Sequence, residues 1–141
     1  MPARATVLAA LALLVAACVT QGPTIGPVPD NQMILSVSNL TDRQLELFVN
    51  DGRVAVLDPA SSKDVPAAQL PPMPWDAQVR LPTGRLLLEL TIRSGSFVRN
   101  ANGGSGPGTR VDLSCGRIDL WSGFPLMGPI PGPGVPGDCD P

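Results

Sequence analysis

The residues that could carry chemistry in this 141-residue chain are few, because the chain contains no histidine. Ser-His-Asp triads, Cys-His dyads and His-ligated metal sites are therefore excluded. The remaining candidates are one pair of carboxylates and the run Ser61, Ser62 and Lys63. Ser62 and Lys63 lack the Ser-x-x-Lys spacing that puts both side chains on one face of a helix. We therefore expect no catalytic residues and predict that the protein is not an enzyme.

The pair of carboxylates, Asp112 and Asp119, flanks the dipeptide Cys115-Gly116. If Cys115 and Gly116 formed a two-residue hairpin turn, the two aspartates would face each other, and like charges directly opposite are destabilising. The turn is then wider, or the segments do not pair, or a cation lies between the carboxylates. Two carboxylates fall well short of the 6–8 oxygen ligands that calcium takes. We predict no metal site and no cofactor.

The first of the three cysteines, Cys18, follows a short apolar segment. Arg4 gives the segment a positive start, and residues 5–17 are apolar apart from Thr6. As a helix such a run would span roughly 20 Å, less than the ~30 Å hydrocarbon core of a bilayer. A positive start, a short apolar middle and small residues at the end are typical of a signal peptide. We assign residues 1–17 to a cleaved signal peptide.

The segment Leu14-Val15-Ala16-Ala17-Cys18 resembles the lipobox of bacterial lipoproteins, with Val15 in a position that is more often leucine. The resemblance implies that Cys18 becomes the first residue of the mature protein. It also implies that Cys18 carries a diacylglycerol and usually an N-acyl chain, which together anchor a protein stably to a membrane. The alternative is a plain secreted protein whose cysteine happens to follow the cleavage site.

The mature part is also similar to small lipoproteins of high-GC bacteria that end in a strand, Cys-Gly, a tryptophan and a Pro/Gly tail with a cysteine. That resemblance covers residues 110–139 best, and it implies no activity. If Cys18 is lipidated, Cys115 and Cys139 remain as one pair in an oxidising compartment, and we predict a disulfide between them. Two free thiols in a reducing compartment would contradict the signal peptide. A closed loop of about 25 residues would stabilise the domain by roughly 3–4 kcal/mol.

Without residues 1–17, the chain has 124 residues, nine basic and twelve acidic, which suits a single domain. Because it shows no basic patch or stripe, we exclude nucleic acid as a partner. Alternating apolar residues predict an all-β fold for residues 33–121, a small antiparallel β-sandwich of about seven short strands with immunoglobulin-like architecture. We expect residues 18–32 to form a Pro/Gly-rich tether. Residues 122–141 are expected to form a Pro/Gly-rich tail that the disulfide holds back on the sheet.

Within the predicted sandwich, Asp51-Gly52 between two alternating apolar runs is the strongest hairpin signal. The composition of residues 39–42 predicts a turn. The apolar run at 85–93 predicts a central strand. The glycines at 94–109 predict a mobile surface loop. Such a loop on a rigid sheet would be a candidate site for binding a partner.

These features favour a non-catalytic, lipid-anchored envelope protein on the extracytoplasmic face of the cell membrane. It would be a binding or structural module whose partners are the membrane, through the acyl chains on Cys18, and an envelope protein or polymer. Two alternatives remain open, a small envelope enzyme that uses carboxylates and an accessory solute-binding component of a transporter. A deep pocket converging on carboxylates would favour the enzyme, whereas a filled core would favour the binding module.

Replacing the lipidated cysteine tests the anchor directly. In Cys18→Ala the acyl chains have no sulfur to attach to, so we expect the protein to move from the membrane fraction to the periplasm or medium. Fractionation followed by immunoblotting measures this, with the unchanged chain as the control. A mutant that stays in the membrane fraction would contradict the anchor.

Overall fold

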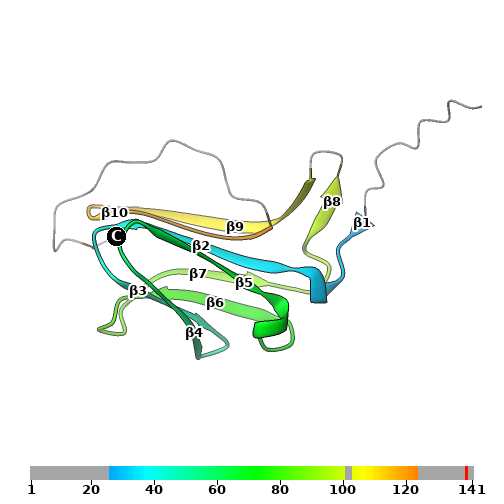
Figure 1. Cartoon of the computed structure of the whole chain (residues 1–141), viewed down its shortest axis with the longest axis horizontal. Helices are drawn as coiled ribbons and strands as arrows, with labels where there is room; N and C mark the ends of the chain where they lie inside the picture. Colours follow the sequence, from blue (N-terminus) through cyan, green and yellow to red (C-terminus); the bar gives the residue numbers. More distant parts are fainter. Residues whose placement is uncertain (1–25, 101–102, 124–138, 140–141) are drawn as a thin grey trace, which may run out of the picture.

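The computed structural model describes residues 26–100, 103–123 and 139, which form an all-β structure of two antiparallel sheets packed together (Figure 1). The predicted antiparallel sandwich is therefore confirmed, with ten strands rather than about seven. None of the helical turns within these residues is long and apolar enough to cross a membrane. The predicted signal peptide and Cys18 lie outside the described residues, as does most of the predicted tail.

The larger sheet has six strands in the order β1-β8-β9-β10-β2-β5. Their bounds are β1 Gly26–Pro27, β8 Val98–Asn100, β9 Gly103–Leu113, β10 Gly116–Gly123, β2 Ile34–Thr41 and β5 Ser61–Pro66. The smaller sheet has four strands in the order β4-β3-β6-β7. Their bounds are β4 Gly52–Leu57, β3 Leu45–Val49, β6 Trp75–Arg80 and β7 Leu86–Ile92. Two 3-10 turns, η1 Asp30–Gln32 and η2 Ala67–Gln69, complete the described elements.

The core lies between the two sheets and follows the period-two alternation of the sequence, because successive side chains of a strand point to opposite faces. The larger sheet contributes apolar side chains that are fully buried, among them Leu35, Val37, Ile118 and Leu120. The smaller sheet contributes Leu45, Leu47, Trp75, Val79 and Ile92, which are also excluded from solvent. The described core is therefore filled mainly by aliphatic side chains, with Trp75 and Phe97 as its aromatic members.

The predicted hairpin at 45–57 is confirmed, and its turn lies one residue earlier than the Asp-Gly signal suggests. Val49 pairs with Gly52, so Asn50 and Asp51 are the two central residues. Their φ angles are 49° and 62°. Asparagine and aspartate tolerate this left-handed region better than other side chains do, which explains why they stand at these positions.

The glycine-rich segment 94–109, predicted to be a mobile loop, instead holds β8 and the first half of β9, which pair with each other. The physical reason is the ring of Phe97, which is nearly buried and lies against the strand. A Cβ atom on Gly104 or on Gly123 would collide with this ring. The glycines therefore make room for an aromatic side chain on the sheet, a known way to stabilise glycine in strands.

The folded domain begins before Met33, the residue at which the sequence predicted it to start. Gly26 pairs with Arg99 in the larger sheet, and the side chain of Val28 is only 5% exposed. Val28 also donates its backbone N–H to the carbonyl oxygen of Phe97 at 2.9 Å. Residues 26–32 are thus part of the domain, because Val28 supplies apolar surface to the core. At the other end, β10 continues to Gly123.

The leucine-rich strand β7 is an edge strand of the smaller sheet, not the predicted central strand. The register between β7 and β6 shifts by one residue: Val79 pairs with Leu88, whereas the next residue, Arg80, pairs with Leu86. Leu87 is the extra residue of this irregularity, and both Leu87 and Leu88 are 8% exposed whereas Leu86 is 43% exposed. The shift explains how a strand with one covered face can bury two consecutive leucines.

The segment 39–42, predicted to be a turn, continues β2 as far as Thr41 and ends at a corner where the chain crosses to the smaller sheet. Asn39 is fully buried there. Its Nδ2 donates to the carbonyl oxygens of Arg43, Leu57 and Asp58 at 2.8, 3.3 and 2.9 Å. Its Oδ1 accepts from the backbone N–H and the hydroxyl of Thr41 at 3.1 and 2.7 Å. We call Thr41, Asp42 and Arg43, together with Asn39, the β2–β3 corner.

Removing the amide of Asn39 should destabilise the domain strongly. Asn39→Ala takes a donor from three backbone carbonyls and an acceptor from Thr41 at a buried corner, so we expect the free energy of unfolding to fall by about 3 kcal/mol. Urea denaturation followed by tryptophan fluorescence measures it. The matched control is Asn31→Ala in η1, where the side chain is exposed and the expected loss is below about 0.5 kcal/mol. Equal losses in the two variants would contradict the role given to Asn39.

Candidate functional site

The two aspartates considered for catalysis, Asp112 and Asp119, do not face each other. The β9–β10 turn is centred on Ser114 and Cys115, one residue earlier than the dipeptide considered in the sequence. Asp112 therefore lies opposite Arg117, and Asp119 lies opposite Arg110. Opposite charges across strands stabilise the pairing, so the conflict that suggested a bridging cation does not arise.

Asp119 is held in an ion pair with Arg117 on the same strand. The Arg117 Nε lies 2.8 Å from Asp119 Oδ2, and the two side chains are only 5% and 4% exposed. They alternate with Ile118 and Leu120, so they lie on the face of β10 away from the core. The Asp119 carboxylate is therefore engaged by an arginine of its own strand and does not point toward Asp112.

The serine–lysine candidates also do not converge. Ser61 donates to the carbonyl oxygen of Asp58 at 2.6 Å, and the hydroxyls of Ser62 and Ser38 lie 2.8 Å apart across β5 and β2. Ser62 and Lys63 are neighbours in the strand β5, so their side chains point to opposite faces. Ser62 therefore cannot use this lysine as a general base, and the hydroxyl of Ser61 is directed at the main chain of Asp58.

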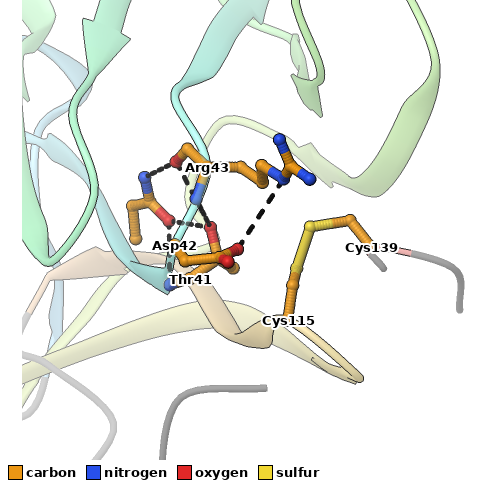
Figure 2. Close-up of a disulfide and its surroundings, with 6 residues drawn as sticks. Thr41, Asp42, Arg43, Cys115 and Cys139 are labelled. Atoms are coloured by element: carbon orange, nitrogen blue, oxygen red, sulfur yellow. Dashed lines mark hydrogen bonds and ion pairs between the residues drawn. A yellow bond between two sulfur atoms is a disulfide. The ribbon is translucent and has the colours of Figure 1, made fainter. Parts of the chain in front are cut away.

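The predicted disulfide is confirmed. Cys115 and Cys139 are joined by an S–S bond of 1.96 Å, with Cα atoms 5.0 Å apart, beside the β2–β3 corner (Figure 2). The main chain also connects the corner to the disulfide. The backbone N–H of Asp42 donates to the carbonyl oxygen of Cys115 at 3.3 Å. The crosslink thus connects Cys139 to the point where the chain passes between the two sheets.

The carboxylate of Asp42 lies next to this disulfide. Its oxygen and the two sulfurs all lie within 4.8 Å of one another, and within the described chain no other group of acidic and cysteine side chains is so close. Such a group could hold a metal only as thiolates, because the thiolate is the form of cysteine that binds metals. In the disulfide form Asp42 is the single anionic ligand, so the group is not a metal site in this state.

A cleft of about 740 Å³ lies at the other end of β3, around the β3–β4 turn. It is lined by the β3–β4 turn, by β6 and β7, and by Gly108 and Thr109 of β9. Three carboxylates line it, from Asp51, Asp76 and Glu89. We call these residues the acidic cleft.

The acidic cleft is built by pairings that fix its side chains. Asn50 binds the start of β6, because its Oδ1 accepts from the backbone N–H of Asp76 at 2.9 Å and its Nδ2 donates to the carbonyl oxygen of Pro74 at 3.0 Å. Asp76 pairs with Thr91 in the register of β6 and β7, and the Thr91 hydroxyl donates to Asp76 Oδ1 at 2.9 Å. These contacts place Asp51 and Asp76 at the same end of the sheet.

The charge of the acidic cleft is mainly negative. A cation, Arg80, lies beside it: the Arg80 Nη2 is 3.7 Å from Asp51 Oδ1, and the guanidinium also lies over the ring of Phe48, 4.7 Å from the centroid. Asp51 is 93% exposed at its side chain, so its pairing with Arg80 is strongly screened by water. The arrangement can accept hydrogen bonds from hydroxyls and attract amines.

Sequence reasoning missed the acidic cleft, although part of the signal was present. The alternation in β6 and β7 places Asp76 and Thr91 on the face away from the core, and the hairpin between the two strands brings these residues together. The approach of Gly108 and Thr109 could not be foreseen, since the segment containing them was interpreted as a loop.

Removing the disulfide should weaken the domain measurably. We expect the double variant Cys115→Ser, Cys139→Ser to lose roughly 3–4 kcal/mol of unfolding free energy, because the unfolded chain regains the entropy of an open loop. Urea denaturation of this variant and of a matched chain, both carrying Cys18→Ala, gives the difference. A loss below about 0.5 kcal/mol would show that the crosslink does not restrain the unfolded state.

The comparisons with known proteins add no assignment to this geometry. No family model matches the chain, and neither a curated protein nor a solved structure is significantly similar to it. The function is therefore inferred from the residues of the acidic cleft, the disulfide and the sequence itself.

Proposed function

We propose that this chain is a non-catalytic, lipid-anchored domain on the extracytoplasmic face of the bacterial cell membrane, where it binds a partner through the acidic cleft. The lipobox-like segment ending in Cys18 supports the anchor and the location. The Cys115–Cys139 disulfide is consistent with an oxidising compartment, which alone is weak support.

The observation that carries the binding role is the gathering of Asp51, Asp76 and Glu89 in one open cleft. Carboxylates on a rigid sheet attract cations and accept hydrogen bonds, and complementary charge speeds association and selects partners. The partner would be an envelope protein or polymer that presents amines or hydroxyls to this face.

The two alternatives are less well supported by the same geometry. Among the described residues, the carboxylate and serine–lysine candidates for an enzyme do not converge on a common point. An accessory solute-binding component would enclose most of its ligand in a pocket, as small-molecule sites usually do. The acidic cleft is open to solvent and is lined by strands of both sheets, which suits a larger partner.

Carbodiimide crosslinking in the native envelope tests the proposal, because this reagent joins carboxylates to amines that touch them. We expect a crosslinked product with the unchanged chain and its loss in a double variant, Asp76→Asn with Glu89→Gln. The matched control, Asp64→Asn with Asp112→Asn, removes the same charge from the larger sheet and should retain the product. Loss of the product in both variants, or retention in both, would contradict binding at the acidic cleft.

A further inference from the structure

The surroundings of the disulfide indicate which sulfur can be attacked by a thiol. Cys115 is fully buried, while Cys139 is 6% exposed. A second cleft of about 530 Å³ is lined by Arg43, Gln44 and the segment 81–85, and it includes Cys139. A thiol arriving from solvent through this cleft meets Cys139 first.

When a thiolate attacks a disulfide, negative charge is spread over the sulfurs. The carboxylate of Asp42 lies beside the two sulfurs of this disulfide. Its Oδ1 is enclosed and has no hydrogen-bond partner in the described structure. A carboxylate oxygen of Asp42 lies within 4.8 Å of both sulfurs (Figure 2). The neighbouring cation, Arg43, lies 3.8 Å from Asp42 Oδ1 at its Nε, but its side chain is 43% exposed and its charge is screened by water. The carboxylate is therefore only partly neutralised.

From this geometry we propose that Cys139 is the site of thiol–disulfide exchange and that Asp42 keeps the exchange slow. The thiolate of a small monothiol attacks Cys139 Sγ, a new S–S bond forms there, and the electron pair of the broken bond leaves on Cys115 Sγ as a thiolate. One disulfide replaces another, so nothing is oxidised or reduced overall. The leaving thiolate forms in a buried position beside the Asp42 carboxylate.

Two costs oppose this step. Burial disfavours the charged thiolate at Cys115, and repulsion from Asp42 raises the energy of both the attacking and the leaving sulfur. The disulfide is therefore protected kinetically by a side chain that makes no bond to it. This role goes beyond the proposed binding function and does not depend on it.

The experiment measures exchange with glutathione, on the full chain carrying Cys18→Ala so that Cys115 and Cys139 are its only cysteines. We expect Asp42→Asn to accelerate the exchange roughly tenfold. Arg43→Gln removes the partly compensating cation and should slow it. Asp51→Asn removes the same charge at the far end of β3, about 17 Å away along the strand, and should leave the rate unchanged. Mass spectrometry should find the glutathione adduct on Cys139.

Reduction by a neutral phosphine separates charge repulsion from local opening. A destabilised corner would expose the bond to both reagents alike, whereas the repulsion proposed here acts more strongly on the anionic thiolate. We expect Asp42→Asn to accelerate the thiolate reaction several times more than the phosphine reaction. Equal acceleration with the two reagents, an unchanged thiolate rate, or an adduct on Cys115 would each overturn the proposal.

Discussion

The two sheets of this domain meet at a corner where one buried amide satisfies backbone groups from separate parts of the chain. Asn39 accepts from Thr41 and donates to carbonyls at the start of β3 and at the end of β4. Without this amide those carbonyls would each lose a donor at a buried corner, and Arg43 and Asp58 would keep only a hydroxyl as donor. Losing a hydrogen-bond partner in a buried position costs more free energy than an ordinary hydrogen bond gains. The end of β2, the crossing to the smaller sheet and the attachment of the disulfide through Asp42 all depend on it.

The strands that pack against the core could be predicted from the sequence, because burial on one face imposes a period of two. The errors arose where a polar or small residue serves a distant part of the chain. Asn39 belongs to a segment with turn-like composition, yet its amide completes the hydrogen bonds of residues up to 19 positions away. Local propensity contains no information on such partners. The same holds for the glycines of β9, whose role depends on the ring of Phe97.

In the candidate site, too, some features could be predicted from the local sequence and others depend on distant residues. The disulfide could be predicted by elimination, because the expectation that Cys18 is lipidated leaves a single pair of cysteines. The relation of Asp112 to Asp119 stayed open at the level of sequence, because it depends on the position of the turn. In an antiparallel hairpin a shift of the turn by one residue replaces a like-charge pair by two opposite-charge pairs. The acidic cleft depends on the register of β6 with β7 and on the approach of β9, neither of which is encoded in a short segment.

The packing of Phe97 on glycine has a consequence for how this sequence can vary. The ring occupies the space where side chains at positions 104 and 123 would stand, so the three positions share one volume. A larger residue at either glycine is tolerable only if the aromatic ring is lost or moved, and a smaller residue at 97 leaves a void. Substitutions at these positions are therefore coupled. In relatives of this protein, we expect the residues at positions 97, 104 and 123 to change together, even where the rest of the glycine-rich segment varies.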